Sequence, residues 1–372
     1  MTEISPALLP EGLRDRLPPE AETLARIRRA VLDVTAAHGF ERVEPPLAEF
    51  EINLVGRLKS ARSNDLLRVI DPASQLTLAL RPDITAQIGR IATTRLAGAA
   101  RPLRLAYAGQ VMKVRGTQLR PEREMCQAGA ELIGSDSIAA VGEALLVALE
   151  SLEHAGATGL SVDLTLPDLV PTLAAGVLPL PADKVDAVQR QLDGKDAGAL
   201  PALGAEAYLP LLEAAGPLDQ ALAKLEALPC RAALADRLTA IRQLGDLIGD
   251  RARVTLDPTE RHGFEYQSWI GFSLFADGVR GEVGRGGSYV VCHADGREEA
   301  AVGFSLYLDP LIGATSLNGT PRRLFLPLGT PPATGAALRA EGWTTIAALG
   351  PNDDARGQRC THRLDGAVPI AL

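Results

Sequence analysis

The sequence predicts an α+β fold in which helices flank an antiparallel sheet. Two stretches of alternating apolar residues, 103–112 and 125–133, are separated only by the polar, basic segment 115–120. Strands that a loop joins, rather than a helix, pair in antiparallel fashion. Helical periodicity lies on both sides of this pair. The stretch at about 166–250 is rich in Ala, Leu and Pro and almost free of aromatic residues, which indicates a helical insertion.

The elements before the strand pair follow from the spacing of apolar residues. A helix is predicted from about Glu20 to His38, where apolar residues recur at steps of three and four, and Gly39 follows as a stop. A half-buried strand is predicted over 75–80, where every second residue is leucine. Pro82 then fits the first turn of a second helix, with Asp83 beside the positive end of its dipole.

Further elements follow the strand pair. Helical periodicity returns over 138–152, ending at Gly156, and over 234–248 inside the insertion. The segment 318–321 reads Asn-Gly-Thr-Pro, a linker by composition. We therefore expect a core at 1–318, with the insertion at about 166–250, and a short α/β tail at 319–372. The remaining elements predicted are strands at 253–256, 269–275 and 289–291, then a strand at 324–328, a helix near 333–341 and a strand at 344–349.

Charge and composition exclude several classes of protein. The 372 residues include 38 Lys and Arg against 46 Asp and Glu, so the formal net charge is −8. This argues against broad binding to nucleic acid or to a membrane surface, which needs a positive face. We find no apolar run of about 20 residues and no secretory signal at the start. We therefore expect a cytoplasmic protein with no membrane partner.

Cysteine and histidine usage argues against metal and disulfide chemistry. The four cysteines lie far apart and form no Cys-x-x-Cys pair, so a disulfide framework or a zinc site is not expected. A reduced compartment fits this pattern. The five histidines are scattered, and none stands at a metal-ligand spacing from another. We expect no metal and no cofactor.

Four polar residues form the main candidate site. Asp83, Thr85, Gln127 and Glu131 combine two carboxylates, a hydroxyl and an amide. Gln127, Gly129 and Glu131 lie at alternate positions of a predicted strand and so face one way. Gly129 between them would leave room above the sheet. Such acceptors could hold an ammonium group and a polar ring such as imidazole. The alternative is a polar sheet face whose groups satisfy one another.

A glycine-rich cluster occupies 281–287, reading Gly-Glu-Val-Gly-Arg-Gly-Gly. It lacks the G-x-G-x-x-G spacing and the following helix of a dinucleotide site. We predict a glycine-rich hairpin turn that brings backbone close to whatever fills the neighbouring pocket.

The order of these motifs is more specific than any one of them. The chain resembles the catalytic core of class II histidyl-tRNA synthetases and, in particular, the related regulatory subunits of ATP phosphoribosyltransferase. The resemblance runs from about Leu9 to about Leu311 and implies an antiparallel sheet flanked by helices, assembled as a dimer. The motifs that carry it are Pro10-Glu11-Gly12-Leu13-Arg14-Asp15, Arg81-Pro82-Asp83-Ile84-Thr85, Arg123-Glu124-Met125-Cys126-Gln127-Ala128-Gly129-Ala130-Glu131 and Gly263-Phe264-Glu265-Tyr266.

Departures from the synthetase pattern favour the regulatory group. Lys113, His262 and Pro310 stand where the synthetases carry arginines that stabilise charge on the phosphates of ATP. Losing one such donor typically costs ~3 kcal/mol of transition-state stabilisation. The tail from Arg322 to Leu372 has 51 residues, too few for the α/β domain that grips the anticodon. The chain is therefore expected not to be an enzyme.

The chain also departs from the regulatory pattern. It has His262 for an arginine, 267–269 reads Gln-Ser-Trp where His-Thr-Gly is usual, and Ser288 replaces a second arginine. Trp269 is bulky where a glycine is expected and could fill the pocket. Two expectations therefore stay open, since the histidine site could have been kept, or weakened and moved while the assembly role remained.

The resemblance implies a non-catalytic subunit that the short-form catalytic chain of ATP phosphoribosyltransferase requires for activity. It further implies a hetero-octamer, a self-dimer within it, and feedback by L-histidine on the first step of histidine biosynthesis, with no nucleic-acid partner. The alternatives are a histidyl-tRNA synthetase and a free-standing histidine sensor. The histidine contacts that the resemblance implies are Asp83, Thr85, Arg115, Gln127, Glu131 and Tyr266.

Overall fold

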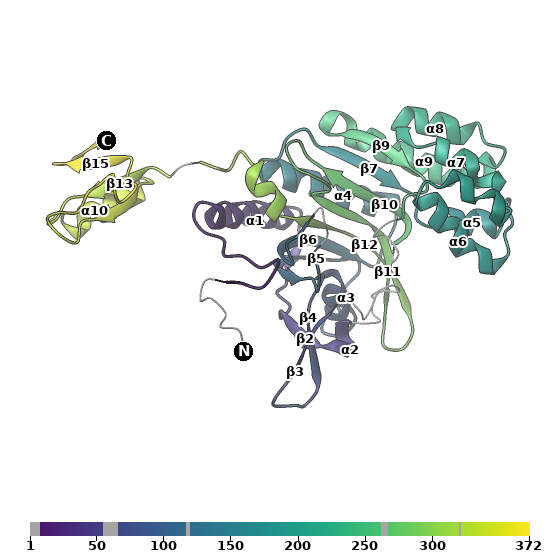
Figure 1. Cartoon of the computed structure of the whole chain (residues 1–372), viewed down its shortest axis with the longest axis horizontal. Coiled ribbons are helices and arrows are strands. Elements are labelled where there is room, and N and C mark those ends of the chain that lie inside the picture. The colour runs from purple at the N-terminus through teal and green to yellow at the C-terminus, as the bar shows by residue number, and fades with distance from the viewer. Residues whose placement is uncertain (1–7, 55–65, 117–119, 262–266, 320) are drawn as a thin grey trace. The chain divides into compact units, whose positions relative to one another are not determined.

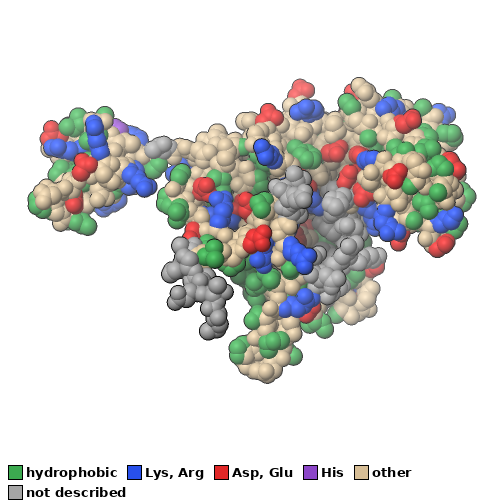
Figure 2. All heavy atoms as spheres, in the orientation of Figure 1, with side chains coloured by type: hydrophobic (Ala, Val, Ile, Leu, Met, Phe, Trp, Pro, Cys, Tyr) green, Lys and Arg blue, Asp and Glu red, His purple; other side chains and the backbone are tan. Residues whose placement is uncertain are grey.

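The computed structural model describes residues 8–54, 66–116, 120–261, 267–319 and 321–372. The chain divides into two compact units, residues 1–317 and residues 318–372. No helix of the described residues is long and apolar enough to cross a membrane. Acidic and basic side chains are interspersed over the face of the molecule in view, and no broad basic field covers it (Figure 2).

A mixed sheet forms the centre of the larger unit (Figure 1). Among the described residues it has nine strands in the order β1-β5-β6-β12-β11-β10-β7-β9-β8. Every pairing from β5 to β7 in this order is antiparallel, while β1–β5 and β7–β9 are parallel. The predicted antiparallel pairing is therefore confirmed. The strands are β1 (Glu41–Arg42), β5 (Leu103–Met112), β6 (Glu124–Ile133), β7 (Ser161–Thr165), β8 (Gly216–Pro217), β9 (Arg253–Asp257), β10 (Gln267–Phe275), β11 (Gly284–Cys292) and β12 (Glu298–Tyr307).

Helices cover both faces of the central strands. Helices α1 (Glu20–Ala37) and α4 (Ile138–His154) pack together and against β6 on one face, where Ala128, Ala130 and Leu132 join the main apolar core. Helix α3 (Thr85–Thr93) contacts β6 and β11. Its Ile88 packs with Tyr107 and Met125 in a second core. Since side chains alternate along a strand, the odd-numbered residues of β6 face α3.

The predicted ends of α1 and α4 are confirmed. Gly39 and Gly156 follow these helices with φ of +79° and +80°, the left-handed region that glycine adopts without steric cost. The Ser137 hydroxyl accepts a hydrogen bond from the Ala140 N–H at 3.3 Å and so caps the start of α4.

Near the site, the predicted start of one helix is wrong, and one predicted strand is confirmed but buries the opposite face. Helix α3 begins at Thr85 rather than at Pro82, because an Asp83 carboxylate oxygen accepts the Thr85 N–H at 2.7 Å and so holds 83 and 84 before the helix. In the strand predicted over 75–80, the buried residue is Ala79, whereas Leu76 is 54% exposed. This strand, β4 (Thr77–Leu80), lies between β2 (Ala48–Phe50) and β3 (Leu67–Ile70) in a separate sheet.

Ala79 is buried because the inner face of that small sheet packs on Leu54 and Leu66, with which it forms a buried cluster. Leu54 ends the short helix α2 (Glu51–Leu54). The leucines of β4 are on the other face. Periodicity therefore identifies the strand but not which of its faces is buried.

Apart from the two-residue strand β8, the regular secondary structure of 166–250 is helical, as its composition predicts. All the apolar residues of the 234–248 pattern are buried along α9. In the described chain this segment contains five α-helices and three 3₁₀ turns, and a fourth 3₁₀ turn, Gly249–Arg251, begins at its end. These helices are α5 (Leu169–Ala174), α6 (Ala182–Asp193), α7 (Leu209–Glu213), α8 (Leu218–Glu226) and α9 (Arg231–Ile248).

The smaller unit is a four-stranded sheet with one helix, in the order β14-β13-β15-β16. Its first strand, helix and second strand match the elements predicted for the tail. The sequence pattern does not predict the last two strands, because they are short and carry charged residues and a proline. The elements are β13 (Arg323–Leu326), α10 (Pro332–Ala340), β14 (Thr344–Ala347), β15 (His362–Asp365) and β16 (Val368–Ala371).

Candidate functional site

Gln127 is the centre of a buried hydrogen-bond network on the α3 face of the sheet. Its side-chain amide nitrogen donates to the Asp83 carboxylate and to the Ser305 hydroxyl, both at 2.7 Å. Its amide oxygen accepts the Ile84 N–H at 3.0 Å. The Gln127 side chain is only 1% exposed, and both its amide nitrogen and its amide oxygen are hydrogen-bonded within the protein. It fixes β6, β12 and the segment before α3 relative to one another.

Glu131 lies deeper on the same face, 1% exposed. Its two carboxylate oxygens accept hydrogen bonds from the hydroxyls of Tyr107, at 3.2 Å, and Tyr289, at 2.7 Å. Within the described residues no arginine, lysine or histidine forms an ion pair with this carboxylate. Arg285 lines the same cavity but pairs with Glu282. Glu131 is therefore a buried acid that no basic side chain of the described residues neutralises.

This environment changes the protonation of Glu131. The pKa of its carboxyl is raised to about 8, mainly by burial and also by the nearby Asp83 carboxylate, while hydrogen bonds from Tyr289, Thr85 and Tyr107 oppose the shift. Burial is the largest cause because a carboxylate loses most of its hydration there. At neutral pH the protein therefore holds Glu131 mainly as the neutral acid.

The cavity at this site is small. It is lined by residues of α3, β6, β11 and β12 and has a volume of about 10 Å³, which is room for about one water molecule. The space predicted above Gly129 is not free. A Cβ on Gly129 would lie 2.6 Å from the Tyr107 hydroxyl and 2.1 Å from the Phe304 carbonyl oxygen. Tyr107, which pairs with Gly129 across β5 and β6, fills that space.

The candidate site residues chosen from the sequence do not include three residues of the network. Tyr107 falls in a predicted strand but not in the predicted site, although its position opposite Gly129 follows once β5 and β6 are paired in register. Tyr289 and Ser305 lie on strands distant in the chain. Ser305 pairs with Gly129 from the other side, on β12, a strand that the pattern does not predict.

Only the start of the glycine cluster, 281–283, lies in the hairpin turn between β10 and β11, and the rest is strand. Gly284, Gly286 and Gly287 lie inside β11, and the turn before it contains Gly278 and Gly281, both with positive φ. Gly286 must be small, because a Cβ there would meet the Phe272 ring at 2.3 Å. The sequence also predicts that the backbone of this cluster lies close to a pocket. This prediction is confirmed, because Gly286 and Gly287 line the small cavity.

The other residues singled out in the sequence do not join this network where the structure describes them. Arg115 is exposed at a bend beyond β5 and does not line the cavity. Tyr266, with His262, lies outside the described residues. Trp269 does not fill the pocket, since it packs against the main core and its indole N–H donates to the Asp136 carbonyl oxygen at 3.3 Å. The pairing of β10 with β11 shifts register between Gln267 and Gly271, and this irregularity interrupts strict alternation, so Trp269 packs against the same core as Ile270 and Phe272.

Arg81 has a structural position. It is 6% exposed, and its guanidinium donates to the carbonyl oxygens of Gln110 and Pro45, each at 2.8 Å, and to the Gln87 amide oxygen at 3.2 Å. These bonds hold the residues before Asp83 against the end of β5. Arg81 therefore positions the candidate site without facing it.

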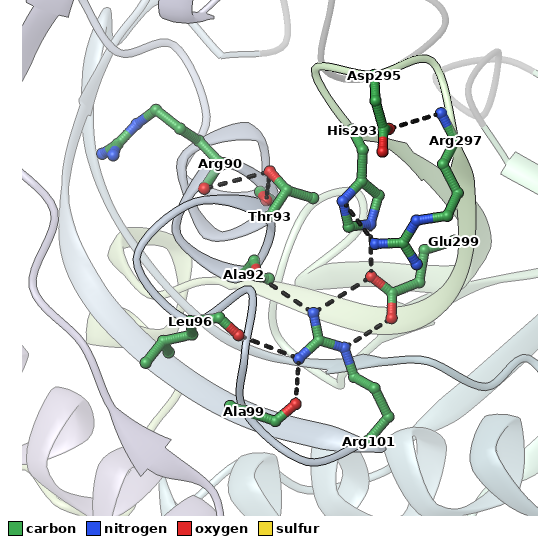
Figure 3. A network of polar contacts seen from close by, with 11 residues as sticks. Arg90, Ala92, Thr93, Leu96, Ala99, Arg101, His293, Asp295, Arg297 and Glu299 are labelled. Carbon is green, nitrogen blue, oxygen red and sulfur yellow. Dashed lines mark hydrogen bonds and ion pairs between the residues drawn. The ribbon is translucent and has the colours of Figure 1, made fainter.

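A second polar network holds the β11–β12 hairpin against the segment that follows α3 (Figure 3). The Glu299 carboxylate accepts from Arg101 Nε at 2.6 Å and pairs with His293 Nε2 at 2.8 Å, while Arg297 donates to His293 Nδ1 at 3.0 Å. Burial raises the pKa of Glu299, but the bonds from Arg101 and His293 outweigh it, and the net pKa is lowered. Arg101 also donates to the carbonyl oxygens of Ala92, Leu96 and Ala99.

That network ties the strands carrying Tyr289 and Ser305 to the helix carrying Thr85. The candidate site is thus fixed from both ends of α3. In the described chain no group of three or more His, Cys, Asp or Glu residues could hold a metal ion.

Known proteins resemble this chain along nearly its whole length. A protein-family model described as histidyl-tRNA synthetase matches residues 12–311. The ATP phosphoribosyltransferase regulatory subunit of Paramagnetospirillum magneticum is 44% identical, with 98% of each chain covered. The protein of the same name from Rhodospirillum centenum is also 44% identical, over 96% of this chain and 95% of that protein.

Solved structures agree with the fold. A structure from Bacillus halodurans C, described as an ATP phosphoribosyltransferase regulatory subunit/histidyl-tRNA synthetase, has a TM-score of 0.80 at 23% identity, covering 97% of this chain and 98% of that one. A histidyl-tRNA synthetase from Nostoc has a TM-score of 0.76 at 17% identity, covering 97% and 91%. The fold is that of class II synthetases, and the chain belongs to the family of ATP phosphoribosyltransferase regulatory subunits.

Proposed function

We propose that this protein is a non-catalytic regulatory subunit that binds the short-form catalytic chain of ATP phosphoribosyltransferase, is required for its full activity, and transmits feedback inhibition by L-histidine. The observation that carries the proposal is the 44% identity, over nearly the full length of both chains, to proteins named as that regulatory subunit. The catalytic chain would supply the chemistry and this protein would shift its conformational equilibrium.

The residues at the expected adenylation positions support a non-catalytic role. Pro310 lies in a 3₁₀ turn, 309–313, and offers neither charge nor N–H. Asp309 beside it is used structurally, since its carboxylate accepts from Arg16 Nε at 2.9 Å and from the Cys126 N–H at 2.6 Å. Arg261 points to the helical insertion, where its guanidinium donates to the Gln189 amide oxygen at 2.9 Å. It cannot substitute for the charge that position 262 lacks.

The second candidate function is histidyl-tRNA synthetase, which the family model favours by its description. It requires histidine-dependent exchange of pyrophosphate into ATP. We expect no exchange above background, because two or three charge-stabilising arginines are replaced and each is worth roughly 10²–10³ in rate. Exchange at rates typical of an enzyme would establish the synthetase and remove the non-catalytic assignment.

The histidine site that we propose is the pocket of Asp83, Thr85, Gln127 and Glu131, with Tyr266 as a further contact. Arg115 lies outside the cavity in the free chain and would have to move toward the bound histidine to contact it. Asp83 is partly exposed and accepts from Gln127 and from the Thr85 N–H, so it can receive an ammonium group at the mouth. The cavity of about 10 Å³ must enlarge to admit histidine. Part of the binding energy is then spent on breaking bonds that Gln127 and Glu131 make in the free chain.

The expected effect of Asp83→Asn is a loss of histidine affinity of about tenfold or more. Asparagine keeps the shape and can accept the Thr85 N–H, but it removes the charge that would pair with the ammonium group. Calorimetric titration with histidine measures the change, and Asp71→Asn on the exposed β3–β4 turn is the matched control. Equal affinities for the native chain and Asp83→Asn would place the histidine site elsewhere.

Assembly is tested separately from the pocket. The purified chain is mixed with a short-form catalytic chain, and the mass of the product is measured by sedimentation. We expect a hetero-octamer that contains dimers of this protein. When the two chains are mixed in equal molar amounts, neither should remain unbound. Two species that sediment independently at micromolar concentration would contradict the assembly role, whatever the result with histidine.

A further inference from the structure

The helical insertion is attached to the chain that leaves β9 through a set of polar bonds away from the candidate site. The helices of the insertion gather beside the ends of β7 and β9 (Figure 1). Helix α6 is anchored in the main core by the buried residues Val188 and Leu192. Its last turn, together with Lys195, contacts the segment 257–261, which begins at the last residue of β9. We call this the α6–β9 contact.

Lys195 is the centre of the α6–β9 contact. Its ammonium group donates to the Asp257 carboxylate and to the Thr259 hydroxyl, both at 2.8 Å. The Thr259 hydroxyl donates in turn to the Asp257 carboxylate at 3.0 Å, and Thr259 is buried. The Asp257 side chain is 15% exposed and that of Lys195 is 41% exposed, so water screens this ion pair only in part.

Two further bonds from α6 hold the other end of the segment. The Asp193 carboxylate accepts the Arg261 N–H at 2.8 Å, and the Gln189 amide oxygen accepts from the Arg261 guanidinium at 2.9 Å. Gln189 is buried, and its amide nitrogen donates to the Pro167 carbonyl oxygen at 2.8 Å, which fixes the orientation of the amide. Both ends of 257–261 are thus attached to the same helix.

The backbone of Lys195 shows that these bonds constrain the end of the helix. Its φ is +57°, in the left-handed region that residues with a side chain adopt only at a cost. Glycine is usual at this position after a helix, yet Gly194 lies one residue earlier, with a φ of −75°. A residue persists in such a conformation where the surrounding structure holds it. Here the side-chain bonds to Asp257 and Thr259 do so.

The Lys195 ammonium group also offsets two carboxylates on adjacent strands. Burial raises the pKa of Asp163 on β7, the Thr255 hydroxyl opposes this by donating to its carboxylate at 2.9 Å, the Asp257 carboxylate raises the pKa, and Lys195 lowers it. Without the Lys195 charge, the carboxylates of Asp163 and Asp257 would repel each other more strongly. The segment 257–261 would then be displaced from α6.

The segment leads along the chain to the proposed histidine site. Gln267, the first residue of β10, follows Arg261 after six steps and pairs with Tyr289 across β10 and β11. The Tyr289 hydroxyl donates to the Glu131 carboxyl at 2.7 Å. Tyr266, the further histidine contact, stands between Arg261 and Gln267 in the sequence. The α6–β9 contact therefore fixes the start of a stretch of chain whose other end is paired with a residue of the candidate site.

We propose that the helical insertion sets the histidine affinity of this protein through the α6–β9 contact. This inference rests on the proposed histidine site. Gln189, Asp193 and Lys195 act as positioning residues, which do not touch histidine but hold the chain that leads to its pocket. A displacement of α6 from 257–261 lowers the affinity for histidine. Bound histidine strengthens the contact in return, because coupling between two sites is reciprocal.

Lys195→Met in the full chain tests this proposal, because methionine keeps much of the side-chain length and removes the charge. Calorimetric titration should show a histidine affinity lower than that of the native chain by roughly fivefold or more. Adding Asp257→Asn should cause no further loss, since both changes act on one contact. Lys184→Met is the matched control, because Lys184 belongs to the same helix and donates to the Leu203 carbonyl oxygen inside the insertion. Its affinity should be that of the native chain.

A second readout needs no variant. Acetic anhydride labels lysine amines, and mass spectrometry follows the labelling of Lys195 and Lys184 in the native chain. Histidine should slow the labelling of Lys195 and leave that of Lys184 unchanged. If the native chain binds histidine but Lys195→Met binds it equally well, or if both lysine variants lose affinity equally, the proposal is overturned while the histidine site stands. If the native chain binds no histidine, the site and this inference fail together.

Discussion

Gly303→Ala is expected to destabilise the larger unit by about 3 kcal/mol or more, one of the largest effects of any single methyl group in this chain. A Cβ at this position would lie 1.7 Å from a Glu131 carboxylate oxygen and 2.7 Å from the Ala130 carbonyl oxygen. Neither neighbour can yield cheaply, because one is backbone and the other is a buried carboxyl held by two tyrosines. Displacing that carboxyl would also break its bonds to Tyr107 and Tyr289.

Chemical denaturation measures this loss, with Gly98→Ala as the control. A Cβ on Gly98 would have no atom within 4 Å, and the φ of this residue is not positive. Its replacement should therefore change the free energy of unfolding by less than about 0.5 kcal/mol. Equal free energies of unfolding for the two alanine variants would contradict the close contact between the Glu131 carboxylate and Gly303.

Glu131→Gln is expected to change how stability depends on pH. The pKa of Glu131 is about 8 in the folded protein, against 4.5 for an ordinary glutamate. Below pH 4.5 both folded and unfolded chains carry the proton. Between pH 4.5 and 8 the unfolded chain loses the proton while the folded chain keeps it, so the contribution of Glu131 to stability is present at low pH and is lost as pH rises through this window.

Glutamine carries no titrating proton and has nearly the same shape. The free energy of unfolding of Glu131→Gln minus that of the native chain should therefore rise with pH, by roughly 3 to 5 kcal/mol from pH 5 to pH 8. Denaturation at several pH values gives this difference directly, and all other titrations cancel. Glu298→Gln, an exposed control on β12, should give a difference that varies little with pH. A flat difference for Glu131→Gln as well would mean that Glu131 ionises normally.

Much of the fold could be predicted from local patterns. The periodicity of α1, α4 and α9 indicates long amphipathic helices, since one face of each is buried over many turns. The pairing of β5 with β6 follows from the loop between them. Patterns are less informative where strands are short or lie on a two-sided sheet. In β4 the small residue Ala79 is buried rather than the leucines, and this depends on what packs beneath it.

Only those residues of the candidate site that lie within the sequence motifs could be predicted. Asp83, Thr85, Gln127 and Glu131 do come together, as the motifs suggest, but their hydrogen bonds are completed by Tyr107, Tyr289 and Ser305. Two of these come from strands more than 150 residues away, so only the register of the sheet brings them there. The sequence predicts open space above Gly129, and the neighbouring strand fills that space with a phenol ring.

The measurement that tests the central claim most directly is the initial rate of phosphoribosyl-ATP formation by a short-form catalytic chain, with and without this protein. The regulatory role predicts a large stimulation that saturates at equal amounts of the two chains and is reversed by histidine. Gly303→Ala, if still folded, should lower the response to histidine more than the stimulation itself. A catalytic rate that this protein leaves unchanged, at concentrations where both chains are folded, would contradict the account.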